Sequence, residues 1–210
     1  MSNALFEKAR EQFLGGGINW TSDTIKISLI DMDDLSQAKL ITGATNATPI
    51  VITAAGHGYS NGDIVAIYGV LGNTAANGIF KVANVTTNTF ELQTRAGANV
   101  SGNGAYTLGG RVMNLTAPDN WDDIASAARV ATATLASKTK TNGVADAADV
   151  TFTAVSGDVC EALIIWKDTG TESTSTLIAF LMNVTGLPVT PNGGDISVTF
   201  DSGINRIFML

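Results

Sequence analysis

EALIIWKD (161–168) and TLIAFLMN (176–183) are the two most apolar stretches of this 210-residue chain. In both, apolar side chains follow one another without alternating with polar ones. A strand that is covered on both faces has such a continuous apolar run, whereas a half-exposed strand alternates. We therefore expect both stretches to be central strands of a sheet, covered on both faces or facing another subunit.

The segment DTIKISLIDM (23–32) has the alternating pattern instead. Ile25, Ile27 and Leu29 alternate with Lys26 and Ser28, which predicts a half-buried strand. Further strands are expected at 128–137 and 148–155, and 195–210 is expected to form a hairpin with its turn at 201–203. These strands, with the two apolar ones, predict an antiparallel β-sandwich.

Residues 3–14 carry the clearest helical pattern of the chain. Apolar side chains fall on one face of this segment and charged ones cover the rest. Ser2 or Asn3 is expected to cap its start, and the glycines at 15–17 are expected to end it. A second, short helical turn is expected at 118–125, where a proline precedes acidic residues.

The middle of the chain, 42–111, differs from the rest. It contains four short strand patterns joined by segments rich in turn-forming residues: 49–55, 63–70, 78–85 and 89–94. Glycine-rich flanks at 42–48 and 95–110 are expected to act as flexible hinges. We therefore expect a small, barrel-like all-β module at 42–111, inserted into a discontinuous host domain formed by 1–41 and 112–210.

The composition excludes several classes of function. Charged residues make up only 15% of the chain and the net charge is −7, without a cluster of Lys and Arg, so we expect no binding to nucleic acid. No apolar stretch approaches the ~20 residues that a membrane helix needs, and no signal peptide is evident, so we expect a protein made in the cytoplasm without membrane insertion. Permanent interfaces between subunits deplete charge, which favours assembly with copies of itself.

The only histidine, His57, lies in the glycine-rich stretch AAGHGYSNGD (54–63). A zinc site needs three or four His, Cys or carboxylate ligands, and a triad of His57, Ser60 and Asp63 would crowd three members into one loop. We favour a turn in which the glycines adopt positive φ, the imidazole bonds to nearby backbone, and Asp63 caps the turn. His57 and Tyr59 are then expected in an exposed loop of the module.

Other candidates for chemistry are weak. Cys160 begins an apolar run, which predicts a buried, inert thiol. The acidic groups at 31–34 and 119–123 do not have the spacing of a calcium loop and are interpreted as solvated turns or helix caps. The three tryptophans are dispersed and are interpreted as core or interface anchors. We therefore expect no enzymatic activity and no catalytic, cofactor or metal site.

HGYSNGDIVAIYGVLGNTAANGIFKVANVTTNTFEL (57–92) resembles a small β module of many tailed-phage virion proteins, often matched to the FCCH domain of ubiquitin-activating enzymes. The resemblance covers about a sixth of the chain. The residues that fit the shared pattern are His57, Gly58, Gly62, Asp63, Val65, Gly69, Asn77, Gly78, Val82, Phe90 and Leu92.

A second resemblance covers most of the remaining chain. ALFEKAREQFLGGGINWTSDTIKISLID (4–31) is similar to the start of small phage structural proteins, and the segments from ARVATATLAS (128–137) onward are similar to their ends. Relatives of this kind pass directly from the first strand to the ARVA strand, which supports an insertion at 42–111. The two resemblances imply a structural component of a virion without enzymatic activity.

The resulting expectation is a homo-oligomeric decoration, collar or fibre-like subunit on the head or neck of a tailed phage. Its partners would be copies of itself and other head, neck or tail proteins, and the N-terminal helix would be its docking element. The side chains expected at the assembly interface are large aromatics: Phe6, Phe13, Trp20, Trp166 and Phe208.

Three alternatives stay open. The chain could be a tail or baseplate component of the same particle. It could be a carbohydrate-binding module that stacks Tyr59, Tyr68 or Phe80 on host-surface glycans. It could also be a glycan depolymerase that uses the carboxylates of Asp119, Asp122 and Asp123.

Overall fold

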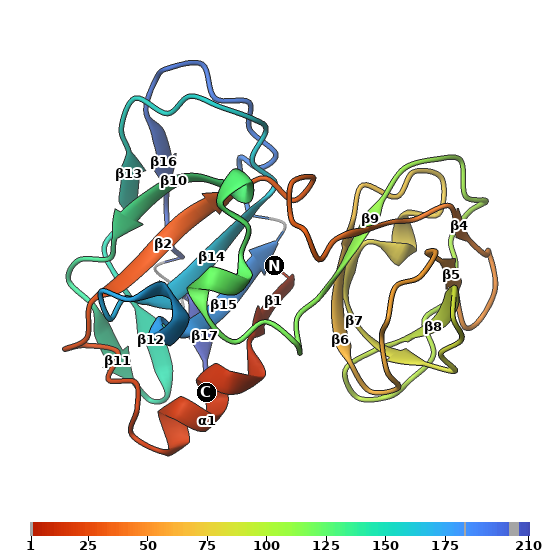
Figure 1. The fold of residues 1–210 in the computed structure, drawn as a ribbon, viewed down its shortest axis with the longest axis horizontal. Coiled ribbons are helices and arrows are strands. Elements are labelled where there is room, and N and C mark those ends of the chain that lie inside the picture. Colours follow the sequence, from red (N-terminus) through yellow and green to blue (C-terminus); the bar gives the residue numbers. More distant parts are fainter. Residues whose placement is uncertain (1, 183, 202–205) are drawn as a thin grey trace. The chain divides into compact units, whose positions relative to one another are not determined.

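The chain divides into two compact units in the computed structural model, which describes residues 2–182, 184–201 and 206–210 (Figure 1). Unit 1 contains residues 3–34 and 118–210, and unit 2 contains residues 35–117. Both are built mainly from antiparallel β-sheet, as the sequence predicted.

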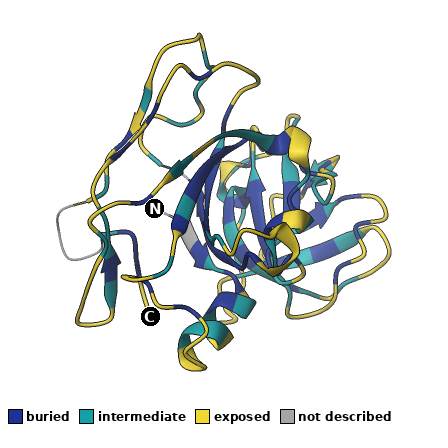
Figure 2. Ribbon diagram, turned by 60° about the vertical axis from the view of Figure 1, so that its left-hand side comes forward, coloured by how far each residue is buried: buried dark blue, intermediate teal, exposed yellow. Residues whose placement is uncertain are grey.

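Unit 1 is organised around a five-stranded sheet. Its strands, in order across the sheet, are β1 (Ser2–Leu5), β15 (Leu177–Met182), β14 (Ala162–Lys167), β2 (Ile25–Ile30) and β10 (Arg129–Thr134). All six residues of β15 and the first five of β14 are buried, and Figure 2 shows buried residues concentrated in the strands. The prediction that the two apolar runs form central, doubly covered strands is therefore confirmed for β14, which lies at the middle of the sheet.

Strand β2 is more buried than its alternating pattern predicted. Ser28 has an exposed fraction of 0% although it is polar. Its hydroxyl lies 2.8 Å from that of Thr132 and accepts a hydrogen bond from Nε1 of Trp166 at 3.0 Å. The polar side chain therefore lies inside unit 1, where neighbouring strands satisfy it, and the prediction of a solvated face was wrong at this position.

The remaining strands of unit 1 form two small sheets. One contains β11 (Thr139–Thr141), β12 (Val144–Asp146) and β17 (Phe208–Met209), and the other pairs β13 (Val150–Phe152) with β16 (Ile196–Val198). The predicted hairpin at 195–210 is wrong, because its two strands pair with β13 and β12 and not with each other. Residues 202 and 203 of its expected turn lie outside the described residues.

The N-terminal helix, α1, spans Glu7–Leu14, so the predicted start at residue 3 was wrong. The preceding residues form β1 beside β15, and the Phe6 N–H donates to the Ile178 carbonyl at 3.1 Å. Pairing with β15 satisfies backbone groups that a longer helix would have bonded internally. The helix ends at Gly15 as predicted, and no helix among the described residues is long and apolar enough to cross a membrane.

Three short 3-10 helices lie in the loops of unit 1. They are η2 (Trp121–Asp123), η3 (Ser126–Ala128) and η4 (Glu172–Thr174). The first confirms the helical turn predicted at 118–125. Its start is capped by Asp123, whose Oδ2 accepts the N–H groups of Asp119 and Asn120 at 2.8 and 3.0 Å.

Unit 2 is one curled, seven-stranded sheet that forms a half-barrel. Its order is β3 (Lys39–Leu40), β9 (Arg111–Asn114), β6 (Ile64–Tyr68), β7 (Gly78–Ala83), β8 (Thr89–Gln93), β5 (Val51–Thr53) and β4 (Gly43–Ala44), with η1 (Thr74–Ala76) between β6 and β7. The four predicted strands correspond to β5, β6, β7 and β8. Strands β3, β4 and β9 were not predicted, because they are only two to four residues long and too short to carry a pattern.

The glycine-rich flanks belong to this unit and are not free hinges. The Ile50 N–H donates to Val100, and the Gly102 N–H donates to Ala47, each at 2.9 Å. At Gly72, where φ is +83°, an added Cβ would lie 2.0 Å from the Ala105 carbonyl oxygen. Glycine is therefore required at position 72 by the close approach of the 104–107 segment. Within the flank itself, an added Cβ would lie 2.8 Å from the Asn46 Cα at Gly102 and 2.5 Å from the Gly72 carbonyl oxygen at Gly104, so these glycines are needed for close packing.

Truncating the centre of the unit 1 sheet should be costly. Ile164→Ala in β14 is expected to lower the free energy of unfolding of unit 1 by about 2–5 kcal/mol, because Ile164 is fully buried and the strand cannot collapse around the cavity. Urea unfolding followed by tryptophan fluorescence measures this, since all three tryptophans lie in unit 1. Val159→Ala at an exposed position is the control and should change the value by less than about 0.5 kcal/mol. Equal losses in both variants would contradict this account of the sheet.

Candidate functional site

The His57 loop of unit 2 is a surface turn that buries the side chains of His57 and Tyr59. Nδ1 of His57 accepts the Tyr59 N–H at 3.0 Å, and the side chain has an exposed fraction of only 5%. Gly56, Gly58 and Gly62 all have positive φ, at 56°, 72° and 101°. The predicted turn, with its imidazole bonded to backbone, is confirmed, whereas the expected exposure of His57 and Tyr59 is wrong.

The geometry of this loop does not fit a catalytic triad. A triad needs an aspartate that accepts a proton from Nδ1 of the histidine. Here Nδ1 is itself an acceptor, and Oδ2 of Asp63 accepts the Ser60 N–H at 3.0 Å and a side-chain N–H of Asn114 at 2.8 Å. Asp63 therefore caps the turn as predicted.

The aromatic side chains considered for glycan stacking are mostly internal. Tyr59 is buried and its hydroxyl donates to the Val112 carbonyl in β9 at 3.0 Å. Phe80 is also buried, and Tyr68 is half-buried. A sugar platform needs exposed ring faces, so Tyr59 and Phe80 do not support that alternative.

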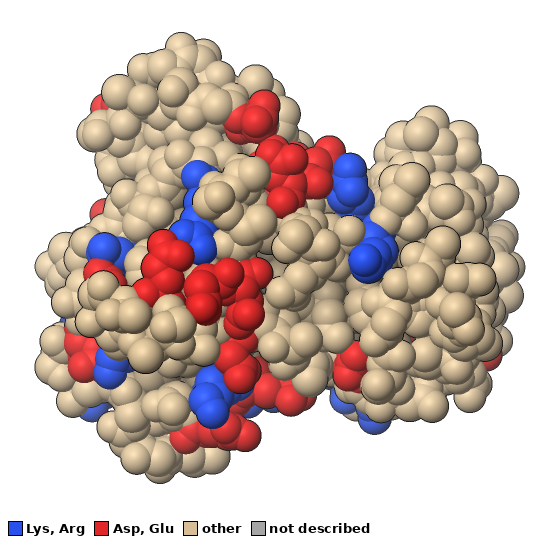
Figure 3. Space-filling model, viewed as in Figure 1, with Lys and Arg blue, Asp and Glu red and all other residues tan. Residues whose placement is uncertain are grey.

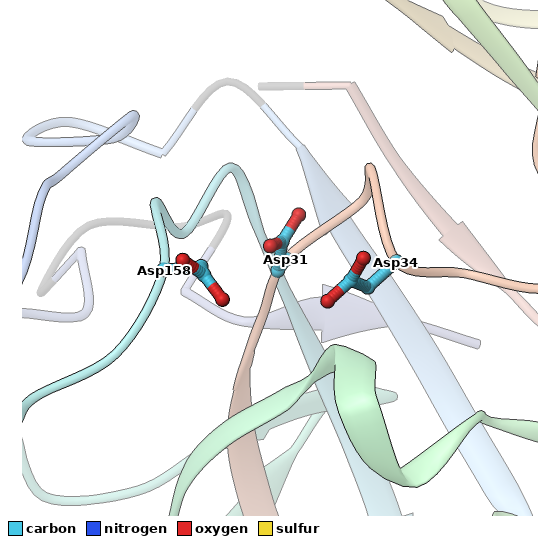
Figure 4. Close-up of side chains that lie close together, drawn as sticks. All are labelled: Asp31, Asp34 and Asp158. Atoms are coloured by element: carbon cyan, nitrogen blue, oxygen red, sulfur yellow. The ribbon is translucent and has the colours of Figure 1, made fainter.

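Unit 1 contains an acidic cluster formed by Asp31, Asp34 and Asp158 (Figure 4). One carboxylate oxygen of each residue lies within 4.8 Å of the others. Asp31 is buried and also accepts the Asp33 N–H at 2.7 Å, while Asp34 and Asp158 are exposed. Among the described residues, this is where three carboxylates can reach one shared cation, and oxygen ligands of this kind suit Ca²⁺ or Mg²⁺.

Glu161 adds a fourth carboxylate beside this cluster. Its Oε2 accepts the Met32 N–H at 2.9 Å. Burial raises the pKa of Glu161 to about 7, and the charges of Asp31 and Asp33 contribute to the same shift. Burial also raises the pKa of Asp31, with smaller contributions from Asp34 and Asp33. The acidic run after β2 is thus partly buried, which differs from the predicted solvated turn.

Cys160 lies next to Glu161 and is inert. The thiol is fully buried, and burial raises its pKa to about 12. A nucleophilic cysteine needs a lowered pKa and access to solvent. The prediction of a buried thiol is therefore confirmed.

Two of the tryptophans are not dispersed but stacked. The rings of Trp121 and Trp166 lie parallel with centroids 4.4 Å apart. Arg129 lies over the Trp121 ring and Lys26 over the Trp166 ring, at 4.5 and 5.3 Å from the centroids. Ion pairs of 2.6 Å hold Arg129 to Glu172 and Lys26 to Asp168. This stack joins η2 to the central sheet, and η2 carries Asp122 and Asp123, two of the three acidic residues considered for a depolymerase.

An apolar pocket of about 270 Å³ lies beside α1 in unit 1. Its walls bring together Phe13, Trp20 and Phe208, with Phe208 centred 5.9 Å from Phe13 and 5.2 Å from Trp20. Lys140 is the charged side chain among those that line it. Leu210 also lines the pocket and is 62% exposed, and Leu14 at the end of α1 is 90% exposed. The exposure of Leu14 and Leu210 could not be predicted from the sequence, because a single apolar residue does not reveal whether it is buried or exposed.

The five aromatic residues expected at an interface thus divide into two groups. Phe6 and Trp166 are buried in the core of unit 1 and already have partners within the chain. Trp20 and Phe208 are also buried, but they form a wall of the pocket, and Phe13 is half-buried there. The pocket is therefore the place where the structure gathers three of the five.

Charge is divided unevenly between the units. Unit 2 has four Lys or Arg and two Asp or Glu, a formal charge of +2, whereas the remaining chain has eight and seventeen, a charge of −9. Figure 3 shows acidic side chains gathered over unit 1 on one face. The surface of unit 2 is built almost entirely from uncharged groups, a composition suited to contact with other protein surfaces.

Removing the acid at position 161 should stabilise unit 1 at alkaline pH. Because the pKa of Glu161 is raised in the folded state, folding favours its protonated form below pH 4.5, and this stabilisation is lost as the pH rises through about 7. Glu161→Gln keeps an oxygen for the Met32 N–H and carries no charge. We expect the free energy of unfolding of the variant to exceed that of the wild type by about 1 kcal/mol at pH 8, a value reduced by solvent screening. At pH 4.5 the two free energies should be equal.

Urea titrations at the two pH values, followed by tryptophan fluorescence, measure this difference. Glu7→Gln, in the first turn of α1, is the matched control and should show no such gain. If the wild type is as stable at pH 8 as the Glu161→Gln variant, the conclusion that burial raises the pKa of Glu161 is wrong.

The sequence was compared with known protein families and with curated proteins. No protein-family model matches this chain, and no curated protein is significantly similar to it.

Proposed function

We propose that this chain is a non-enzymatic structural subunit of a tailed-phage particle, which assembles with copies of itself on the head or neck. The observation that carries the proposal is the apolar pocket beside α1. Three aromatic side chains expected at an interface meet there, the exposed Leu210 lines the pocket, and the exposed Leu14 directly follows the pocket residue Phe13 in the sequence. An exposed apolar surface in a chain with few charges favours burial against another subunit.

The proposal extends to the domain organisation and to the partners. Unit 1 is an antiparallel β-sandwich host domain that provides the self-contact, and unit 2 is an inserted module that meets solvent or other virion proteins. The resemblance of 57–92 to a phage β module and the low charge of unit 2 support this. A position on the tail or baseplate is the alternative within the same class.

The occupant of the pocket is a second copy of this chain. Leu210 lines the pocket, and Leu14 follows the pocket residue Phe13; both are exposed, and a symmetric two-fold contact would bury them, since such an interface uses one patch twice. Lys140 is the one charged side chain among the described residues that line the pocket. The contact therefore brings few like charges together, and repulsion between the two copies is small.

Sedimentation velocity tests this contact. The wild type should sediment as an oligomer, and the double variant Leu14→Glu/Leu210→Glu should be a monomer with an unchanged unfolding temperature. Leu40→Glu/Leu71→Glu is the control, because these two leucines are also exposed but lie in unit 2. It should remain oligomeric.

A wild type that stays monomeric at high micromolar concentration and does not co-sediment with phage particles would refute the proposed function. Oligomers that persist in the Leu14→Glu/Leu210→Glu variant would refute only the role of the pocket.

A further inference from the structure

The tautomer of His57 is determined by its surroundings. Nδ1 accepts the Tyr59 N–H at 3.0 Å, so the neutral ring must carry its proton on Nε2. Nε2 is buried and has no hydrogen-bond partner among the described residues. A second proton could enter the ring only at Nδ1, where it would oppose the Tyr59 N–H. The turn is therefore compatible with the neutral imidazole and not with the imidazolium.

Tyr59 links this turn to the core of unit 2. Its hydroxyl donates to Val112 in β9, and its ring packs against Phe90 of β8 with centroids 5.5 Å apart. His57 contacts the same Phe90 ring edge-on at 5.1 Å. Losing the bond between His57 and Tyr59 thus loosens a side chain that joins the loop to two strands.

Both ends of the loop are fastened elsewhere. The Gly56 N–H donates to the side chain of Asn88 at 3.0 Å, and the Gly62 N–H donates to Val82 in β7 at 2.9 Å. Between these ends, the Tyr59 N–H depends on the imidazole of His57, and the Ser60 N–H depends on the carboxylate of Asp63. Of these two side chain types, histidine is the one whose ordinary pKa lies between pH 5 and 8.

Charged groups around the ring do not compensate a positive imidazole. On the loop itself, the Asp63 carboxylate is engaged by Ser60 and Asn114, and the Tyr59 hydroxyl has a pKa raised by burial and stays neutral. On β8, Glu91 follows Phe90 in a strand of alternating burial and binds the Asn84 side chain at 2.7 Å.

Burial lowers the pKa of His57. The carbonyls of Thr89 and Thr86, in the turn packed against the ring, partly oppose the shift, although neither completes a hydrogen bond with Nε2. No carboxylate contributes to this shift among the described residues.

We propose that the loop 54–63 is an acid-sensitive clasp, in which protonation of His57 breaks its bond to Tyr59 and releases the loop from β8 and β9. The clasp is closed above pH about 6.5, the ordinary pKa of histidine, and opens progressively below it, because the open form takes up the proton first. His57 is the only histidine of the chain, so a response of unit 2 to pH near 6 is expected at this loop.

Hydrogen exchange of the full chain, measured by NMR, tests the clasp. After correction for intrinsic exchange, the protection of the Tyr59 amide should fall about ten-fold between pH 7.5 and 5.5, since opening is coupled to uptake of one proton. The amide of Ile164 in unit 1 serves as the internal control and should not lose protection over this range.

His57→Asn is the decisive variant. An asparagine oxygen can accept the N–H two residues ahead without titrating, so this variant should keep the turn and lose the pH dependence. If Tyr59 exchange in the variant depends on pH as in the wild type, the proposal is overturned.

The wild type alone provides a second measurement in case the variant does not fold. His57 is the only histidine, so its imidazole resonances are unambiguous. The titration midpoint should lie below 6.5 and accompany the rise in Tyr59 exchange. A midpoint at or above 6.5 would overturn the proposal.

Discussion

The complete burial of β14 is the constraint on which unit 1 depends. The strand has no solvated face from Ala162 to Trp166, so β15 and β2 must satisfy its backbone and other elements must cover both sides. Trp166, at its end, donates to the buried Ser28 and stacks on Trp121. Through that stack η2 is joined to the sheet, so one strand determines where polar groups, aromatics and loops lie.

Local patterns predicted the strands that carry a clear period or are bounded by turn residues. Examples are the apolar runs of β14 and β15 and the short strands β5 to β8. In each, the residues of the segment itself and its flanking turns are enough to indicate the strand. The start of α1 could not be found in this way. Residues 2–5 are compatible with a helix, and only pairing with β15, more than 170 residues away, makes them a strand.

The candidate sites depended on contacts that no local pattern contains. Pairing of Ala162 with Ile30 places the segment before β14 beside the segment after β2, and so brings Asp158 to Asp31. The acidic run after β2 could be seen in the sequence, but its burial and its fourth carboxylate could not. At His57 the turn was predictable from the glycines, whereas the burial of the His57 and Tyr59 side chains depends on their packing against Phe90 of β8.

One physical effect acts with opposite sign in the two units. Burial disfavours the charged form of any group, so it raises the pKa of Glu161 in unit 1 and lowers that of His57 in unit 2. Between pH 5 and 7, acid therefore favours the folded form of unit 1 and opposes that of unit 2. A single two-state transition cannot describe such a chain across this range. The probes separate naturally, because every tryptophan lies in unit 1 and every tyrosine in unit 2, so the two responses can be followed independently in one molecule.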